Sequence, residues 1–431
     1  MRIAIIGGGI SGLYAAEKLR ARHQITLFEA PRTLGGHVNT VDVEIGGERH
    51  AVDTGFIVYN ERTYPHFIRL LTDLGIESQP TSMSFSVRCD RSNLEYNGNT
   101  LNTLFAQRGN LLRPRFYRLL SEIVRFNRLA KEERGRQATG EAASTQTVGE
   151  FLAAHRFAEN FSQWYLLPMG AAIWSCPQDK FAGFPIAFLV DFFFHHGLLD
   201  LVDRPVWRVI KGGSRTYVNR MLERFGSNVE VRAGTPIQSV SRTSAQVTVT
   251  PVGQPSELFD HVIFACHSDQ ALKLLADPTP TEKELLTAFP YQPNVATLHT
   301  DVSVLPRRKL AWASWNVFLP DQQAALPRVT YCMNILQGLK SRHVFNVSLN
   351  CDDAIDPAKV LARFQYAHPV FSEQSRAAQR RHAELINVNR TSYCGAYWRN
   401  GFHEDGVVSA LAVCRGIEGA SVGTLISQEV A

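Results

Sequence analysis

Short apolar runs and a glycine-rich turn alternate at the start of the chain. Arg2–Ile6 is an apolar run of strand length, and Gly7–Gly9 is typical of a turn. From Ile10 to Arg20 the apolar residues recur at helical spacing, and Ile25–Glu29 is a second apolar run. A strand, a glycine turn, a helix and a second strand predict a βαβ unit.

Further along, the pattern separates into helical and strand-like regions. Residues 103–204 are mostly helical in pattern and rich in aromatic side chains, and a polar stretch at 137–147 predicts an exposed loop. Strands are predicted within Val229–Thr250, at His261–Ala265 and at Asn294–Asp301. The remaining predicted helices are Thr63–Leu74, Leu111–Arg136, Pro357–Tyr366 and one from Gly406 onward.

Composition narrows the class of protein. The chain has 431 residues, 45% hydrophobic and 20% charged, and is long enough for two cores. A net charge of +5 gives no reason to expect a nucleic-acid partner. The seven cysteines are scattered without a CxxC pair, which disfavours a disulfide framework or a metal site. With no signal peptide before the first strand and no spanning apolar run, we expect a cytoplasmic protein.

The first turn has the spacing of a pyrophosphate-binding loop. Gly7, Gly9 and Gly12 occupy the three positions of a GxGxxG pattern between strand and helix. The first glycine permits the tight turn, the second lets phosphates approach the backbone, and the third lets helix and strand pack. Glu29, at the end of the second strand, is placed to accept hydrogen bonds from ribose hydroxyls. These residues, with Ser11 in the same turn, predict a bound dinucleotide.

The segments that follow resemble the flavin-containing amine oxidase superfamily, which includes monoamine oxidases and carotenoid desaturases. After the acidic residue this family carries an arginine-containing loop and a Gly-Gly-Arg, and here Glu29–His37 reads EAPRTLGGH. An Asp-x-Gly follows as Asp53–Gly55, and Gly401–Gly406 resembles the family's Gly-Tyr-x-Glu-Gly. In that family, the helix starting there points its N-terminus at the flavin and stabilises negative charge.

The resemblance implies FAD as the cofactor. Because no cysteine or histidine is convincingly placed for a covalent link, we expect FAD to be bound non-covalently. Arg32 and His37 stand in for the family's two arginines as donors to phosphate, and Ile237 takes the position of an adenine-contacting valine. The other residues assigned to FAD contact are Gly35, Gly36, Asp53, Thr54, Gly55, Phe402, His403, Glu404, Asp405, Gly406 and Val407.

Two departures from the family bear on the substrate. Its oxidases often carry a lysine near the flavin on a substrate-domain strand, and the matching strand Asn294–Asp301 has none. Rapid reoxidation by oxygen is therefore not expected. Phe402 replaces one tyrosine of the family's amine cage, and the sequence does not identify its partner. The missing tyrosine cage disfavours an amine substrate.

A closer resemblance is to a bacterial subfamily of predicted NAD/FAD-binding proteins. Its matching segments are Val52–Tyr64, Ala172–Ser175, His196–Leu199 and Gly401–Gly406. Such proteins often belong with cyclopropane-fatty-acyl-synthase-like methyltransferases. The resemblance therefore implies a lipophilic small molecule or a phospholipid acyl chain as substrate, and a methyltransferase as partner.

Two sequence features bear on a lipid substrate, and each has a plainer alternative. Phenylalanines crowd residues 181–194, just after Trp164, Tyr165 and Trp174, and predict either an apolar tunnel or an ordinary core. In Leu111–Arg136 an apolar face is flanked by arginines. That pattern predicts either peripheral contact with the inner face of an anionic membrane or a solvated helix packed on a core. The arginines concerned are Arg115, Arg118, Arg125 and Arg128.

His196 and Tyr59 are the candidate acid–base residues. His196 lies in the phenylalanine-rich stretch, and Tyr59 follows the Asp-x-Gly segment that runs beside the flavin in the family. The alternative for His196 is a structural histidine, and His299 on the predicted strand competes for the role.

We predict an α/β protein with a Rossmann-like FAD-binding domain and a mixed α+β substrate domain. The FAD domain comprises residues 1–80, 205–270 and 380–431, and the substrate domain comprises 81–204 and 271–379, so their segments interleave. The expected reaction is hydride transfer from a fatty acyl substrate to flavin, giving desaturation or isomerisation. The alternatives are an amine oxidase acting on a hydrophobic amine and a flavoprotein partner subunit of a lipid methyltransferase.

Overall fold

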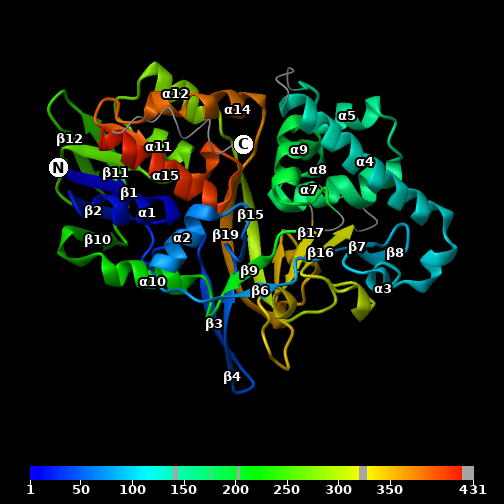
Figure 1. Ribbon diagram of the computed structural model, residues 1–431. Helices are drawn as coiled ribbons and strands as arrows, with labels where there is room; N and C mark the ends of the chain where they lie inside the picture. Colours follow the sequence, from blue (N-terminus) through cyan, green and yellow to red (C-terminus); the bar gives the residue numbers. More distant parts are fainter. Residues whose placement is uncertain (139–143, 175, 201–203, 320–327, 420–431) are drawn as a thin grey trace.

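A five-stranded parallel sheet forms the centre of one lobe of the protein. Figure 1 shows the computed structural model, which describes residues 1–138, 144–174, 176–200, 204–319 and 328–419. The strand order is β10 (Val229–Ala233), β2 (Gln24–Glu29), β1 (Arg2–Ile6), β14 (His261–Phe264) and β20 (Thr391–Tyr393). Strands far apart in the sequence are therefore hydrogen-bonded neighbours, as an interleaved α/β fold requires.

Both faces of this sheet are covered. On one face lie α1 (Ile10–Leu19), α2 (Pro65–Asp73), α10 (Arg215–Arg224) and α15 (His403–Ile417). Ile3 and Ile5 of β1 point into that helical layer, whereas Ala4 and Ile6 point to the opposite face. The opposite face packs against a three-stranded sheet of β11 (Ile237–Arg242), β12 (Val247–Pro251) and β13 (Glu257–Phe259), and against α11 (Ser268–Leu274) and α12 (Pro280–Thr287). Burial on both faces explains why the four residues of β1 after Arg2 are all apolar.

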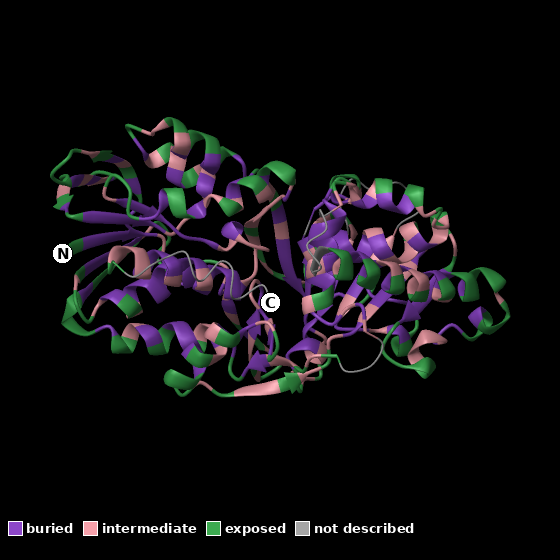
Figure 2. Cartoon of the chain, turned by 45° about the horizontal axis from the view of Figure 1, so that its top comes forward, coloured by how far each residue is buried: buried purple, intermediate pink, exposed green. Residues whose placement is uncertain are grey.

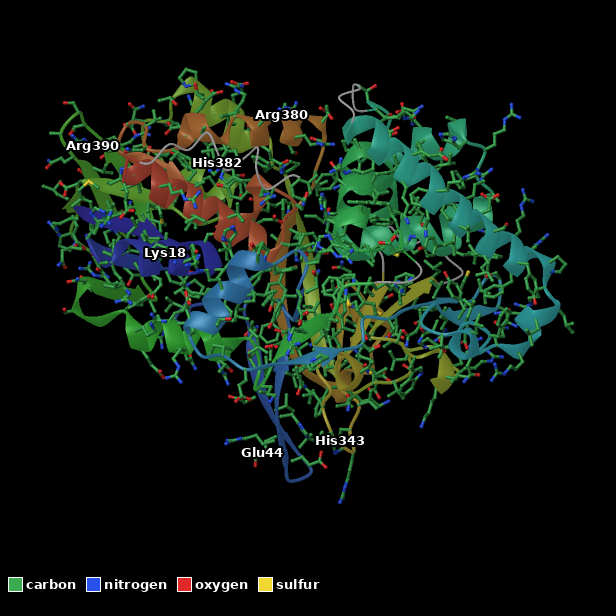
Figure 3. The ribbon with its side chains drawn as sticks, in the orientation of Figure 1. Lys18, Glu44, His343, Arg380, His382 and Arg390 are labelled. Carbon is green, nitrogen blue, oxygen red and sulfur yellow. The ribbon has the colours of Figure 1, made fainter. Side chains whose placement is uncertain are left out.

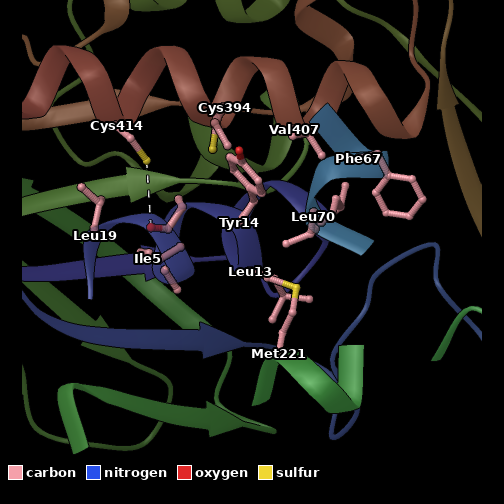
Figure 4. Packing of buried hydrophobic residues seen from close by; sticks show 14 of the residues in the cluster. Ile5, Leu13, Tyr14, Leu19, Phe67, Leu70, Met221, Cys394, Val407 and Cys414 are labelled. Atoms are coloured by element: carbon pink, nitrogen blue, oxygen red, sulfur yellow. Dashed lines mark hydrogen bonds between the residues drawn. The ribbon is translucent and has the colours of Figure 1, made fainter. Parts of the chain in front are cut away.

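The packing of α1 against α15 brings the two ends of the chain together. Figure 4 shows Leu13 and Tyr14 of α1 among the buried residues that also include Val407 and Cys414 of α15. The Cys414 thiol donates a weak hydrogen bond to the backbone oxygen of Ala15, over 4.0 Å. The close approach of these helices places their N-termini beside each other.

The second lobe combines a mixed sheet with a helical layer. Its seven strands are β19 (Val360–Pro369), β15 (Tyr291–His299), β18 (Asn346–Leu349), β17 (Arg328–Cys332), β16 (Trp315–Leu319), β7 (Phe85–Cys89) and β8 (Leu94–Asn97). The helices include α4 (Pro114–Ala138), α5 (Val148–Ala154), α7 (Leu167–Trp174), α8 (Gln178–Ala182) and α9 (Ile186–His195). The long antiparallel strands β15 and β19 run between the two lobes (Figure 1).

Two small sheets complete the connections. A hairpin of β3 (Thr40–Ile45) and β4 (Glu48–Asp53) projects from the bottom of the view in Figure 1. Next to it, β9 (Trp207–Ile210) pairs with both β5 (Val58–Asn60) and β6 (Ser78–Thr81).

The predicted fold class is confirmed, and one predicted element is wrong. The βαβ unit, the helix near Thr63–Leu74 and the C-terminal helix are present as β1, α1, β2, α2 and α15. The helix predicted at Pro357–Tyr366 is instead the strand β19, preceded by a single 3-10 turn at Pro357–Lys359. Partly buried residues alternate there with exposed Leu361, Arg363 and Gln365, which is a strand period. Part of the loop predicted at 137–147 lies outside the described residues.

The domain boundaries stay a prediction. Each strand of the five-stranded sheet lies in a segment assigned to the FAD domain. Helix α12, from a segment assigned to the substrate domain, contributes Leu285 and Leu286 to the cluster under that sheet.

The phenylalanine-rich stretch has two faces. One packs in the core of its own lobe, and the other contacts the facing lobe. Phe181, Phe184 and Phe193 are at most 1% exposed, so they pack as a core and do not line a tunnel. Phe188 and Phe192 lie on the face of α9 that contacts Phe371 and Phe402. In Figure 2 the segments of the two lobes that face each other are largely buried.

Helix α4 packs its apolar face inward. Phe116 and Phe126 are buried in the helical cluster, which is the core-packed alternative for this helix. Arg125 is engaged within the protein, because it pairs with Glu122 at 2.9 Å and lies 4.2 Å from the Phe157 ring centroid. Membrane contact by this helix stays a prediction.

None of the helices in the described part of the chain combines the length and apolar composition needed to cross a bilayer.

Candidate functional site

The glycine loop between β1 and α1 leaves open space at one position only. A side chain at Gly12 would put its Cβ 1.9 Å from the backbone oxygen of Gly7, and one at Gly7 would meet the Ala265 oxygen at 2.7 Å. At Gly9, the N-cap of α1, a Cβ would meet nothing within 4 Å. Gly7 and Gly12 are therefore required by packing, whereas Gly9 borders space that a ligand can fill.

A second glycine turn closes the other side of that space. The Gly35 amide donates to the backbone oxygen of Gly8 at 2.8 Å, and Gly9 and Gly35 form an isolated parallel bridge. Gly36 has a φ of 59°, which favours glycine, and its Cβ position lies 3.2 Å from the Gly9 Cα. The predicted Gly9 and Gly36 thus lie side by side at the N-terminus of α1.

The N-termini of α1 and α15 converge on the same region. The Ser11 hydroxyl donates to the backbone oxygen of Gly406 at 3.0 Å. A Cβ at Gly406 would lie 2.8 Å from the Ile10 side chain, so only glycine allows this approach. Each helix N-terminus carries a positive partial charge of about half a unit, so two together favour an anion strongly.

The predicted adenosine contacts come together at the far end of the loop. Glu29 ends β2, and its carboxylate accepts from the Gly8 amide at 2.5 Å. Burial raises the pKa of Glu29, and this backbone hydrogen bond opposes that rise. The exposed side chain of Arg32 lies beside Gly234, and buried Ile237 begins the next strand. These residues border one edge of the sheet, as a ribose and adenine site requires.

The Asp53 carboxylate accepts several hydrogen bonds from protein groups. Its carboxylate accepts from the Thr40 hydroxyl at 2.6 Å, from the Ser214 amide and hydroxyl at 2.9 and 2.8 Å, and from the Gln337 amide group at 2.9 Å. Burial raises its pKa to about 6, while these hydrogen bonds oppose the rise. Asp53 therefore joins the β3–β4 hairpin to the N-terminus of α10 and to the second lobe.

Two acids at the start of α15 act as helix caps. Glu404 accepts from the amides of His66 and Phe67, at 2.9 and 2.8 Å, in the first turn of α2. The N-cap of α2 is Tyr64, which has no side-chain hydrogen bond to that turn, so Glu404 supplies the missing cap. Burial raises the pKa of Glu404 to about 7. Asp405 accepts from the Phe402 amide at 2.8 Å and caps its own helix.

Thr54 and Gly55 carry the chain past His37. A Cβ at Gly55 would lie 2.1 Å from the His37 backbone oxygen, so the position requires glycine. The Thr54 hydroxyl donates to the Asn39 backbone oxygen at 3.0 Å and lies 2.9 Å from the Tyr366 hydroxyl. At the start of α15, His403 stacks on Phe56 at 3.7 Å, and Val407 is fully buried.

A wall of histidine and tyrosine rings borders the site and was not predicted. The His37 ring lies 5.1 Å from that of Tyr366, 5.3 Å from that of His368 and 6.1 Å from that of His267. Burial and the neighbouring histidines hold the pKa of His37 well below its usual range. Its Nε2 is buried and has no hydrogen-bond partner among the described residues. The one sequence signal was the two-residue spacing of Tyr366 and His368 on β19.

His196 and Tyr59 are not brought together. The His196 ring stacks on Phe192 at 3.9 Å and lies 5.7 Å from Phe402, at the N-terminus of α15. Tyr59 is 3% exposed and packs on Phe67 within the helical layer of the FAD lobe. His299 is fully buried, and its Nε2 forms a hydrogen bond with the Ser348 hydroxyl at 2.8 Å, as expected of a structural histidine.

The residues present fit FAD. The open space at Gly9 lies at two helix N-termini, where a pyrophosphate is stabilised, and Glu29 stands at the ribose end. His37 is partly buried, and its buried Nε2, which has no hydrogen-bond partner among the described residues, offers a polar contact in the same region. Non-covalent binding stays a prediction.

Replacing Gly9 with valine should separate folding from cofactor binding. The apoprotein should keep its circular dichroism spectrum, because the substituted side chain enters open space. FAD affinity should fall by about tenfold or more, since that space is the phosphate site. The matched variant Gly12→Val should instead lower the free energy of unfolding by on the order of 3 kcal/mol. Normal FAD content in Gly9→Val would refute this placement of the loop.

Replacing Glu29 with alanine should remove the ribose contacts. We expect FAD binding to weaken by about 1.5–3 kcal/mol, measured by titrating apoprotein with FAD and following flavin fluorescence. Glu44→Ala, on the exposed tip of the β3–β4 hairpin labelled in Figure 3, is the control and should not change the affinity. Equal affinities for the two variants would contradict the role assigned to Glu29.

Comparisons with known proteins agree with this site. Residues 10–317 match the sequence profile described as flavin-containing amine oxidoreductase. No curated protein sequence matches the chain. Among solved structures, a cofactor-binding redesign of putrescine oxidase aligns with a TM-score of 0.69 at 15% identity, covering 98% of this chain and 100% of its own.

Two further solved structures of proteins with other activities have the same fold. A CLA-producing fatty acid isomerase from P. acnes aligns with a TM-score of 0.66 at 15% identity, covering 96% of this chain and 98% of its own. Reduced UDP-galactopyranose mutase aligns with a TM-score of 0.67 at 15% identity, covering 100% and 98%. The profile match spans most of the chain, and the nucleotide loop, converging helices and ribose-side acid are in place. The chain belongs to the flavin-containing amine oxidoreductase family and is an FAD-dependent oxidoreductase.

Proposed function

We propose that this oxidoreductase desaturates or isomerises a lipophilic acyl substrate where α9 faces the N-terminus of α15. The observation that carries the proposal is the aromatic contact between the lobes at this point. Phe192 stacks on Phe402 with ring centroids 4.9 Å apart, and Phe188 lies 5.1 Å from Phe371. Phe402 is the N-cap of α15, so the apolar face begins at the cofactor site.

The chemistry of this face favours a hydrocarbon. Phe188, Phe192 and His196 are spaced four residues apart and lie along one side of α9 and its C-cap. The Phe371 ring lies 3.4 Å from the Cβ position of Gly401, next to Phe402 in the chain. A surface of aromatic rings binds an alkyl chain through dispersion and burial of apolar area. The carboxylates beside this face are already engaged, Asp191 with Arg134 and Asp405 with the Phe402 amide.

His196 is placed to take the proton. Its Nδ1 lies 2.9 Å from the Phe192 backbone oxygen, so Nδ1 carries the hydrogen and Nε2 has a free lone pair. Burial lowers the pKa of His196 to about 4, so the imidazole is neutral at pH 7. FAD, when bound, supplies the hydride acceptor. The rings around His196 hold the reacting carbon and exclude water, and Nε2 receives the proton that leaves the adjacent carbon.

Other observations support an acyl substrate over an amine. Strand β15 contains no lysine, so an electron acceptor other than oxygen is expected, as in a desaturase. A fatty acid isomerase shares the fold, but that likeness supports the proposal by analogy only.

The proposal predicts single-turnover chemistry on acyl lipids in the absence of oxygen. FAD-loaded protein mixed with an oleoyl phospholipid or with oleate should yield a product two mass units lighter or a positional isomer. Desaturation should also bleach the flavin absorbance in proportion to product, because the flavin retains both electrons. Mass spectrometry of the lipids and flavin spectra measure both. Benzylamine and putrescine serve as the comparison and should give no aldehyde.

Flavin reduction and aldehyde from the amines alone would overturn the proposal in favour of an amine oxidase. A flavin that neither lipids nor amines reduce, with lipid products absent, would favour a partner subunit of a lipid methyltransferase.

A further inference from the structure

Arg376 is a half-buried guanidinium without an anionic partner. It lies on α14 (Glu373–Arg380), and its Cζ is 5.9 Å from the centroid of the Phe188 ring. Among the described residues, none forms a hydrogen bond or an ion pair with this guanidinium. Burial lowers the pKa of Arg376, which is the direction expected when a cation loses water without gaining a full counter-charge.

The acids around Arg376 are committed elsewhere. Asp191 on α9 is the strongest negative influence on Arg376, but it pairs with Arg134 at 2.9 Å. Glu373 belongs to the same helix as Arg376 and lies at the surface, 3.8 Å from Arg380. The arrangement leaves the cluster of Arg134, Asp191 and Arg376 with one excess positive charge.

Arg376 stands at one end of the aromatic face of the proposed site. Phe188 contacts Arg376, whereas Phe192, one helical turn later, contacts Phe402 at the cofactor site. From Phe188 to His196 the rise along α9 is about 12 Å. A chain whose end group binds Arg376 therefore crosses Phe188 and Phe192 before it reaches Phe402.

We propose that Arg376 binds the anionic end group of the acyl substrate, a carboxylate or a phosphate monoester. This inference rests on the proposed function and names the feature by which the site selects and orients its substrate. A guanidinium binds either group through two parallel hydrogen bonds, and a water-poor position strengthens them. Anchoring one end of the chain would also fix which carbon lies beside Phe402.

Binding of three ligands with the same chain tests the proposal. Oleate, oleyl phosphate and oleyl alcohol are titrated into FAD-loaded protein below their aggregation limits, and the change in flavin absorbance gives each dissociation constant. The wild-type protein should bind the better of the two anions about tenfold or more tightly than the alcohol. Whichever anion binds more tightly identifies the end group. Arg376→Gln should lose that preference and keep its affinity for the alcohol.

The matched control is Arg380→Gln, one turn further along α14. Figure 3 labels Arg380 at the outer surface, where its side chain is 64% exposed. This variant should retain the preference for the anion. If Arg376→Gln also retains it, or if the wild-type protein binds all three ligands equally, the anion site is overturned while the proposed function stands. If none of the three ligands perturbs the flavin, both proposals fail.

Discussion

The contact between Ser11 and Gly406 is the constraint on which the rest of the site depends. It brings together the N-termini of two helices from opposite ends of the chain, where like partial charges repel each other. Gly406 allows the backbones to meet. A bound anion stabilises this region, because it offsets the repulsion between the two positive helix ends. The fold thus concentrates positive potential at the point where the glycine loop leaves open space.

Buried carboxylates hold the surrounding elements in register. Glu404 caps α2 from the neighbouring helix, and Asp53 ties a hairpin, a helix start and the second lobe together. Burial raises the pKa of both acids, and their hydrogen bonds oppose that rise, together with Arg215 near Asp53 and His66 near Glu404. In this structure both carboxylates bond to protein groups, and their assigned contact with FAD stays a prediction.

The sequence was informative where the physical requirement is local. The glycine loop and Glu29 lie within one βαβ unit, so their spacing predicted their positions. The segment Gly401–Gly406 was assigned through its resemblance to the family. The wall of histidine and tyrosine rings was not predictable, because His37, His267 and His368 come from three distant segments. The error at β19 concealed the last of these, since a helix would not place Tyr366 and His368 on one face. Arg376 was missed because the ring that it contacts, that of Phe188, lies on α9 in a distant segment of the chain.

The central claim is that FAD binds where α1 and α15 converge, with the aromatic face of α9 beside it. A crystal structure of the FAD-loaded protein tests this most directly. The account predicts density for the pyrophosphate between Gly9 and Gly36, and for the flavin ring at the N-terminus of α15 next to Phe402. A flavin ring lying away from Phe402, or a pyrophosphate outside the Gly9 loop, would contradict it.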